Sequence, residues 1–151
     1  MGTEIRKVAK NWQHPKDKNG YYKPLYDETF EEALNKREEK RKKWIAGEDP
    51  DADQFNYPKT TKGFIEYYGN GPNPEFYRVE KWTEEEACCY QMYENVSEGT
   101  PLSPVFESLK ELEHWLVTSE GLSRQEAEDF CKSALLFKQK AIAAYEQLLR
   151  Q

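Results

Sequence analysis

The chain has 151 residues, a formal net charge of -6 and a mean hydropathy of -1.03. Its length predicts a single domain over residues 1–151, and its 14% of aromatic residues argues against a disordered chain. No apolar run approaches the ~18 residues of a membrane span, and the first residues lack the apolar centre of a signal peptide, so we expect a cytoplasmic protein.

The N-terminal segment, residues 1–26, combines aromatic rings with positive charge, since it holds six basic and two acidic side chains. Residues 4–12 are compatible with a short extended segment, although their alternation of apolar and polar residues is weak. Asn19-Gly20 is typical of a type I′ turn, and the prolines on either side restrict flanking strands to short or edge pieces. We therefore expect a small β-hairpin or an ordered aromatic loop here.

A charged helix is expected over residues 27–46. Asp27 is a suitable N-cap, and Thr29 with Glu32 offers a second capping box slightly further on. The helix should end at Gly47. Its apolar stripe is thin, and its basic side chains alternate with acids that cancel their field. This pattern predicts a solvated helix face and argues against direct nucleic-acid binding.

Residues 47–81 are rich in proline, glycine and asparagine, but they also carry several large aromatic rings. A flexible linker would not hold so many rings. We therefore expect an ordered loop over the core, with one short helix or strand at Phe64–Tyr68.

The strongest local signals lie in the stretch WTEEEACCYQMYENVSEGTPLSPVF, which opens a helical part over residues 82–151. Thr83 begins a capping-box pattern. Cys89, Met92 and Val96 then fall on one face of a helix. These signals together predict a central apolar helix.

Gly99 and the two prolines after it are expected to end this helix in a stiff elbow, SEGTPLSP. Two interpretations of the elbow stay open. It is either a rigid connection between two helices or the polar wall of an aromatic ligand pocket. In the second case Ser97, Thr100 and the Gly99 amide would hold a phosphate or a carboxylate.

Further capping boxes at Ser108 and Ser123 begin amphipathic helices after the elbow. The second continues as one long helix or as two helices that meet near Phe137. The fold class is therefore expected to be mainly α, with four or five helices and long aromatic-rich loops. The apolar residues expected to be buried together are Trp82, Cys89, Met92, Val96, Phe106, Leu112 and Leu116.

The sequence contains no P-loop, GxGxxG, HExxH or GxSxG motif, so we expect no enzymatic activity. Its three cysteines show no CxxC spacing, and there are only two histidines. A structural zinc site needs about four such ligands. We therefore expect no metal and no cofactor, and we interpret the cysteines as buried free thiols.

The segments NWQHPKDKNGYYKPLYD and YQMYENVSEGTPLSPVFESLKELEHWL resemble two recurrent segments of uncharacterised phage and prophage proteins. The resemblance covers residues 5–118. It implies a viral or prophage origin and hence a place in the host cytosol, but it implies no mechanism.

Residues 83–151 hold six basic and thirteen acidic side chains. Many of these acids stand at expected helix N-termini, where the helix dipole favours them, so their simplest role is to stabilise helix starts. The alternative is an acidic face that binds a host protein with a basic surface. The candidate partner-binding residues, from the acidic block and the elbow, are Glu120, Glu126, Glu128, Asp129, Ser97, Glu98 and Thr100.

These interpretations lead to two candidate functions. The first is a small phage interaction protein that modulates a host protein, such as an anti-defence, anti-CRISPR-like inhibitor. The second is a small-ligand-binding or enzymatic accessory domain with an aromatic pocket beside the elbow. The sequence predicts neither the identity of the partner nor the oligomeric state.

Overall fold

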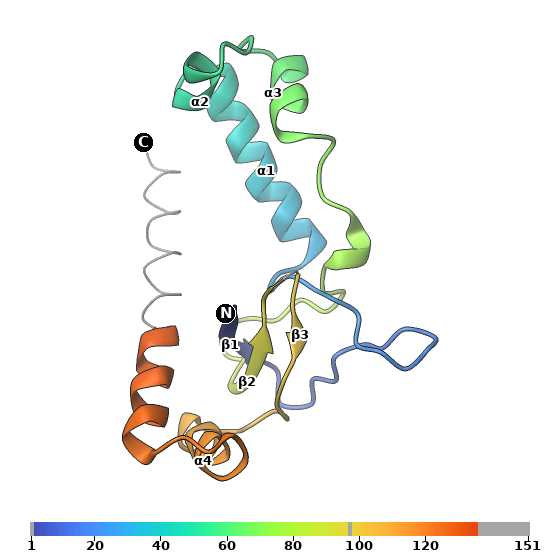
Figure 1. The fold of residues 1–151 in the computed structure, drawn as a ribbon. Helices are drawn as coiled ribbons and strands as arrows, with labels where there is room; N and C mark the ends of the chain where they lie inside the picture. Colours follow the sequence, from blue (N-terminus) through green and yellow to red (C-terminus); the bar gives the residue numbers. More distant parts are fainter. Residues whose placement is uncertain (1, 97, 136–151) are drawn as a thin grey trace. The chain divides into compact units, whose positions relative to one another are not determined.

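The computed structural model describes residues 2–96 and 98–135, in which helices accompany a small antiparallel sheet (Figure 1). Contacts divide the chain into two compact units, one from Met1–Leu25 with Lys81–Gln151 and one from Tyr26–Glu80. The structure thus confirms that the chain forms several helices, but its architecture is mixed α and β. The single domain stays a prediction, and the question of one or two helices near Phe137 lies outside the described residues.

The first unit is built on three antiparallel strands in the order β1-β2-β3 (Figure 1). They are β1 (Thr3–Val8), β2 (Cys89–Glu94) and β3 (Thr100–Pro101). β1 pairs with β2 along its whole length, from Thr3 opposite Glu94 to Val8 opposite Cys89. Because side chains alternate along a strand, the sheet presents two different faces.

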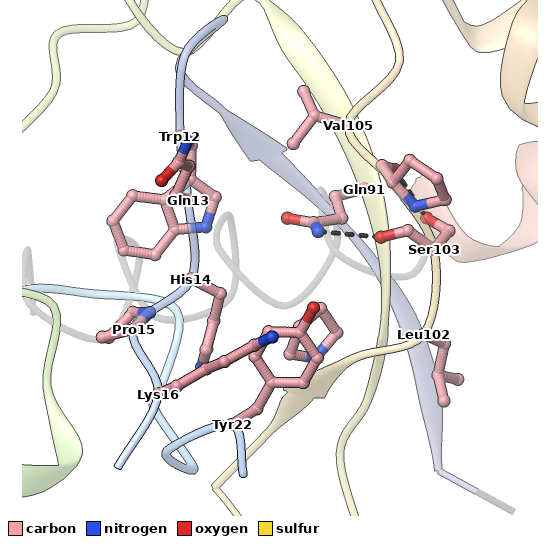
Figure 2. Close-up of a pocket in the computed structure, with 12 residues that line it drawn as sticks. Trp12, Gln13, His14, Pro15, Lys16, Tyr22, Gln91, Leu102, Ser103 and Val105 are labelled. Atoms are coloured by element: carbon pink, nitrogen blue, oxygen red, sulfur yellow. Dashed lines mark hydrogen bonds between the residues drawn. The ribbon is translucent and has the colours of Figure 1, made fainter. Parts of the chain in front are cut away.

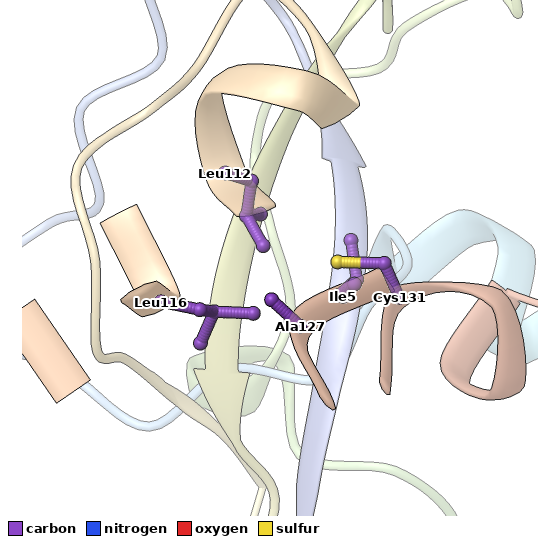
Figure 3. Packing of buried hydrophobic residues seen from close by; sticks show 5 residues of the cluster. All are labelled: Ile5, Leu112, Leu116, Ala127 and Cys131. Carbon is purple, nitrogen blue, oxygen red and sulfur yellow. The ribbon is translucent and has the colours of Figure 1, made fainter. Parts of the chain in front are cut away.

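One face of the sheet lies under α4 (Leu109–Glu120) and under a helix over residues 124–135. Ser108 caps α4 as expected, and Gly121 ends it in the left-handed conformation. Side chains from β1 and from both helices converge on one buried cluster (Figure 3). Its members are Ile5, Leu112, Leu116, Ala127 and Cys131.

The predicted central helix is wrong, because Cys89 and Met92 belong to strand β2 and Val96 lies beyond its end. The capping box is real: the Glu86 amide donates to Thr83 Oγ1 at 3.1 Å, but the turn stops at once. The segment Cys89–Glu94 has apolar and aromatic residues at both helical and strand spacing. Pairing with β1, far away in the sequence, decides between the two.

The expected core is confirmed for Leu112 and Leu116, which are buried in one cluster, whereas Cys89 is buried outside that cluster. Met92 and Phe106 are partly buried and pack against the cluster of Figure 3. Val96 is 74% exposed, because the strand ends at Glu94 and Val96 lies in the loop beyond it. Trp82 is half-buried and lies edge-on to Trp12, with ring centroids 5.0 Å apart.

The second unit begins with the charged helix α1 (Phe30–Ile45). Of the two starts that the sequence offered, the capping box of Thr29 and Glu32 is the correct one, because both of its hydrogen bonds are formed. The helix buries Ala33 and Trp44 and leaves most of its surface in solvent, as expected.

The segment expected to be an ordered loop contains three short helices: α2 (Pro50–Gln54), α3 (Thr61–Tyr68) and η1 (Pro74–Phe76). Trp44, Ala52 and Phe64 form a second buried cluster, against which three tyrosines pack. The indole N–H of Trp44 donates to the Pro58 carbonyl at 2.9 Å, so this buried polar group is satisfied.

Candidate ligand-binding cleft

A cleft of about 830 Å³ lies in the first unit (Figure 2). It lies on the face of the sheet opposite α4, because Gln91 lines it whereas Tyr90 and Met92 pack against the cluster of Figure 3. One wall comes from the N-terminal aromatic segment, and the other comes from β2 and from residues 101–105, where the chain returns along β2. The residues that line it are Trp12, Gln13, His14, Pro15, Lys16, Tyr22, Gln91, Pro101, Leu102, Ser103, Pro104 and Val105.

The first wall is shaped by a small hairpin, which is one of the two alternatives that the sequence left open for this segment. Lys16 and Tyr22 form an antiparallel bridge, and the Asp17 carboxylate accepts from the amides of Asn19 and Tyr21. The turn is not type I′, because Asn19 does not have a positive φ; only Gly20 does, at +86°. The hairpin places the Lys16 ammonium 5.0 Å from the centroid of the Tyr22 ring.

The second wall is an irregular return strand. Tyr93 pairs with Pro101 and Tyr90 with Phe106, so the returning chain has two residues more than β2 over this span. The extra residues form a bulge that includes Pro104, which has no N–H to donate to the ladder. The Ser103 hydroxyl replaces a main-chain acceptor of the β-sheet here, because it accepts a hydrogen bond from the Met92 amide at 2.9 Å.

Gln91 forms the polar part of the cleft and is only 6% exposed. Its Nε2 donates to the Ser103 carbonyl oxygen at 2.8 Å. Because a carbonyl oxygen can only accept, this bond fixes which end of the amide faces Ser103. Oε1 therefore points away from Ser103, toward the wall that carries Trp12 (Figure 2), and it has no hydrogen-bond partner among the described residues.

The aromatic wall is held by a chain of hydrogen bonds centred on Tyr93. Its hydroxyl accepts from Trp12 Nε1 and lies 2.9 Å from His14 Nδ1. His14 Nε2 lies 2.5 Å from the Lys23 carbonyl, which can only accept, so Nε2 carries the ring proton. Burial lowers the pKa of His14, and the neutral ring then accepts the Tyr93 proton at Nδ1. Each ring is thus fixed in place.

Arg6 supports this wall from within the sheet. Its guanidinium lies 4.1 Å from the centroid of the Tyr93 ring and donates to the carbonyls of Leu25 and Glu98. Gly99 was expected to end a helix, but in the structure it allows the backbone to lie close to the Arg6 guanidinium. Its φ is +128°, and a Cβ there would collide with the guanidinium of Arg6.

The elbow residues turn out to be a β-hairpin and its return strand, so the interpretation as a helix–helix connection is wrong. Thr100 belongs to β3, and Glu98 gives its carbonyl to Arg6. Ser97 lies outside the described residues. Neither Glu98 nor Thr100 lines the cleft, whose wall begins one residue later, at Pro101.

The acidic candidates are separated from the cleft in the chain and differ in their surroundings. Glu120 is exposed at the end of α4, whereas the Asp129 carboxylate accepts a hydrogen bond from Gln125 Nε2. Glu126 closes a capping box with Ser123, whose backbone amide lowers the pKa of this carboxyl. Glu128 lies 4.0 Å from the Lys110 ammonium.

The cysteines are free among the described residues, but they are not all buried. Cys89 and Cys131 are buried as expected, whereas Cys88 is exposed, because neighbours on an extended chain point to opposite sides. Burial raises the pKa of Cys131 to about 11. The described part of the chain contains no group of three or more His, Cys, Asp or Glu residues that could hold a metal ion. It also contains no helix long and apolar enough to cross a bilayer.

Comparisons of the chain with protein-family models, with curated proteins and with solved structures found no match. The assignment of a site therefore depends on the geometry of the cleft and on the chemistry of its lining.

Proposed function

We propose that this protein is a binding protein without a catalytic step, and that the cleft between Trp12 and Ser103 is its ligand site. One observation supports this most: Gln91, which lines the cleft, has a buried side-chain acceptor with no hydrogen-bond partner among the described residues. An unsatisfied buried polar group costs about 1–3 kcal/mol, so a fold retains one where something else compensates for it.

The composition of the lining also favours a ligand site. Ligand pockets are concave, mostly apolar and aromatic, and carry a few polar groups that fix orientation. Here the rings of Trp12, His14 and Tyr22 face a wall of proline, leucine and valine side chains. The hydrogen bonds through Tyr93 hold this wall in place before any ligand arrives, which lowers the entropic cost of binding.

Binding fits the cleft better than catalysis. The titratable side chains among its described lining residues are His14, Lys16 and Tyr22. Both ring nitrogens of His14 are already in hydrogen bonds, with Tyr93 and Lys23. A general base must reach the proton that it removes, and this imidazole has no free nitrogen to do so.

The proposal is tested by titrating the protein with a library of planar fragments, including indole, uracil and benzimidazole, while following the Trp12 indole N–H by NMR. Tyr22→Ala should weaken every fragment that shifts this signal. Tyr21→Ala is the matched control, because Tyr21 is 72% exposed and does not line the cleft. Equal effects of the two variants, or no fragment that shifts the Trp12 signal, would show that the cleft is not a ligand site.

A second candidate function rests on the acids Glu120 and Asp129 near the end of the described chain. As a phage-encoded protein in the host cytosol, the chain would use them to bind a basic surface of a host defence protein and inhibit it. Replacing both with lysine should weaken capture of that protein from host lysate, most strongly at low salt. Unchanged capture across a salt series would reject the acidic face.

A further inference from the structure

We infer that the ligand of the cleft is a mononucleotide, whose base is read by Gln91 and whose phosphate is held by Lys16. This inference rests on the proposed function, since it names the ligand of the same site. Three features of the cleft lead to it: a fixed hydrogen-bond acceptor, flanking aromatic rings and one cationic side chain.

The acceptor selects for a donor on the ligand. Oε1 of Gln91 cannot exchange places with Nε2, because Nε2 is held by the Ser103 carbonyl. Any partner of Oε1 must therefore carry an N–H or O–H group. Each common nucleobase carries an N–H or NH₂ donor on its pairing edge, and proteins read single bases through this edge.

The rings beside the acceptor suit a flat ligand. Trp12 and Tyr22 both line the cleft, and Tyr22 is 44% exposed, so part of its surface is open to a ligand. Stacking of a base on an aromatic side chain contributes about 1–3 kcal/mol per base and tolerates every base, since each has a π face.

The position of the one cationic side chain indicates where the phosphate of the ligand would lie. Lys16 is the one cationic side chain among the described lining residues. The other basic residue there is His14, and burial lowers its pKa, so that the ring stays neutral. Lys16 lies over one face of the Tyr22 ring, so a base that packs beside this ring would bring an attached anion close to the ammonium. Residues 1–26 carry four more basic than acidic side chains, whereas the chain as a whole has a net charge of -6.

The return strand disfavours the main competing ligand, an extended peptide. Peptides that add to a sheet edge need free main-chain donors and acceptors along that edge. Pro101 and Pro104 have no N–H, and the Ser103 carbonyl is taken by Gln91. Recognition on this side must therefore come from side chains, which favours a compact ligand.

The inference is tested by calorimetric titration at low salt with the monophosphates of uridine, cytidine, adenosine and guanosine. Uridine and inorganic phosphate alone serve as ligand controls. We expect the nucleotides to bind more tightly than uridine, and phosphate alone to bind weakest. Lys16→Met should reduce the affinity for uridine monophosphate to that for uridine, while Lys18→Met, a lysine of the same hairpin outside the lining, should leave it unchanged.

The contact with Gln91 is tested from both sides. Gln91→Met should weaken uridine monophosphate by about tenfold or more, as expected for a lost buried hydrogen bond. Methylation of N3 of the uracil ring removes the donor from the ligand and should have the same effect on the unaltered protein, so the test survives if the variant does not fold. Equal affinity for the methylated and unmethylated nucleotides would contradict the contact.

The outcomes separate the two proposals. If planar fragments shift the Trp12 signal but none of the four nucleotides binds, the cleft is a ligand site and the nucleotide inference is wrong. If nothing shifts the signal, both are wrong. Binding of nucleotides that is insensitive to Lys16→Met and to methylation would place them elsewhere and overturn the inference.

Discussion

The carbonyl oxygen of Ser103 lies 2.8 Å from Nε2 of Gln91, and this single bond determines what the cleft offers to a ligand. It holds the amide with Oε1 turned away from Ser103 and toward the wall of Trp12, where the buried oxygen finds no donor among the described residues (Figure 2). Ser103 can reach Gln91 because the return strand bulges just before it pairs again with β2 at Phe106. The irregular strand and the unpaired acceptor are therefore parts of one feature.

Ser103→Ala should destabilise the first unit by about 1–3 kcal/mol. The Ser103 hydroxyl is the acceptor of the Met92 amide, and alanine would leave this N–H unsatisfied in a largely buried place. Urea unfolding of the variant gives the free-energy difference, with the exposed Ser119→Ala as control. A loss below about 0.5 kcal/mol would mean that water reaches the Met92 amide and that the bulge does not depend on the hydroxyl.

Gly99→Ala should destabilise the protein more than Gly20→Ala. Both glycines have a positive φ, so both variants include the strain of an alanine in that region, about 1–3 kcal/mol. Only at Gly99 would the new Cβ also meet the Arg6 guanidinium, whereas nothing lies within 4 Å of a Cβ at Gly20. Thermal unfolding of the two variants isolates the steric part. Equal losses would place the Arg6 side chain elsewhere.

Folding stability should fall as the pH decreases from 6.5, because His14 is neutral in the folded protein. Burial sets its pKa below the ordinary value of 6.5, so between these two values the unfolded chain binds more protons than the folded one. Urea unfolding at pH 7.5 and pH 5.5 measures the loss. His14→Gln should remove this part of it, and the exposed His114→Gln serves as the matched control. A pH dependence that survives in His14→Gln would contradict the assignment of a neutral ring.

Local signals in the sequence correctly predicted the features that depend only on residues nearby in the sequence. Thr29 and Glu32 form the capping box that their spacing indicates. Ser108 caps α4 by accepting from the Glu111 amide, although the Glu111 carboxylate accepts from the Glu107 amide, and Gly121 ends that helix. Such signals act within one turn, so they can be read without knowing the fold.

The same type of signal failed at Thr83, because a distant part of the chain decides the conformation of residues 89–94. Val8 pairs with Cys89 across some eighty intervening residues, and the segment satisfies both periodicities until that partner is known. The sequence indicated the cleft only as one of two interpretations, an aromatic pocket beside the elbow, and Gln91 was missed for a related reason. The aromatic wall and the elbow residues 101–104 were each recognised as ordered, but nothing local indicates that Gln91 lies between them.

The most direct test of the central claim is urea unfolding of the unaltered protein and of Gln91→Met, each without ligand and with saturating uridine monophosphate. Without ligand we expect the two free energies of unfolding to agree within about 0.5 kcal/mol, since losing the bond to Ser103 is offset by removing an unpaired acceptor. With ligand, only the unaltered protein should gain substantial stability. If Gln91→Met is already destabilised by about 2 kcal/mol or more without ligand and both proteins respond equally to the nucleotide, Gln91 supports the fold and is not part of a ligand site.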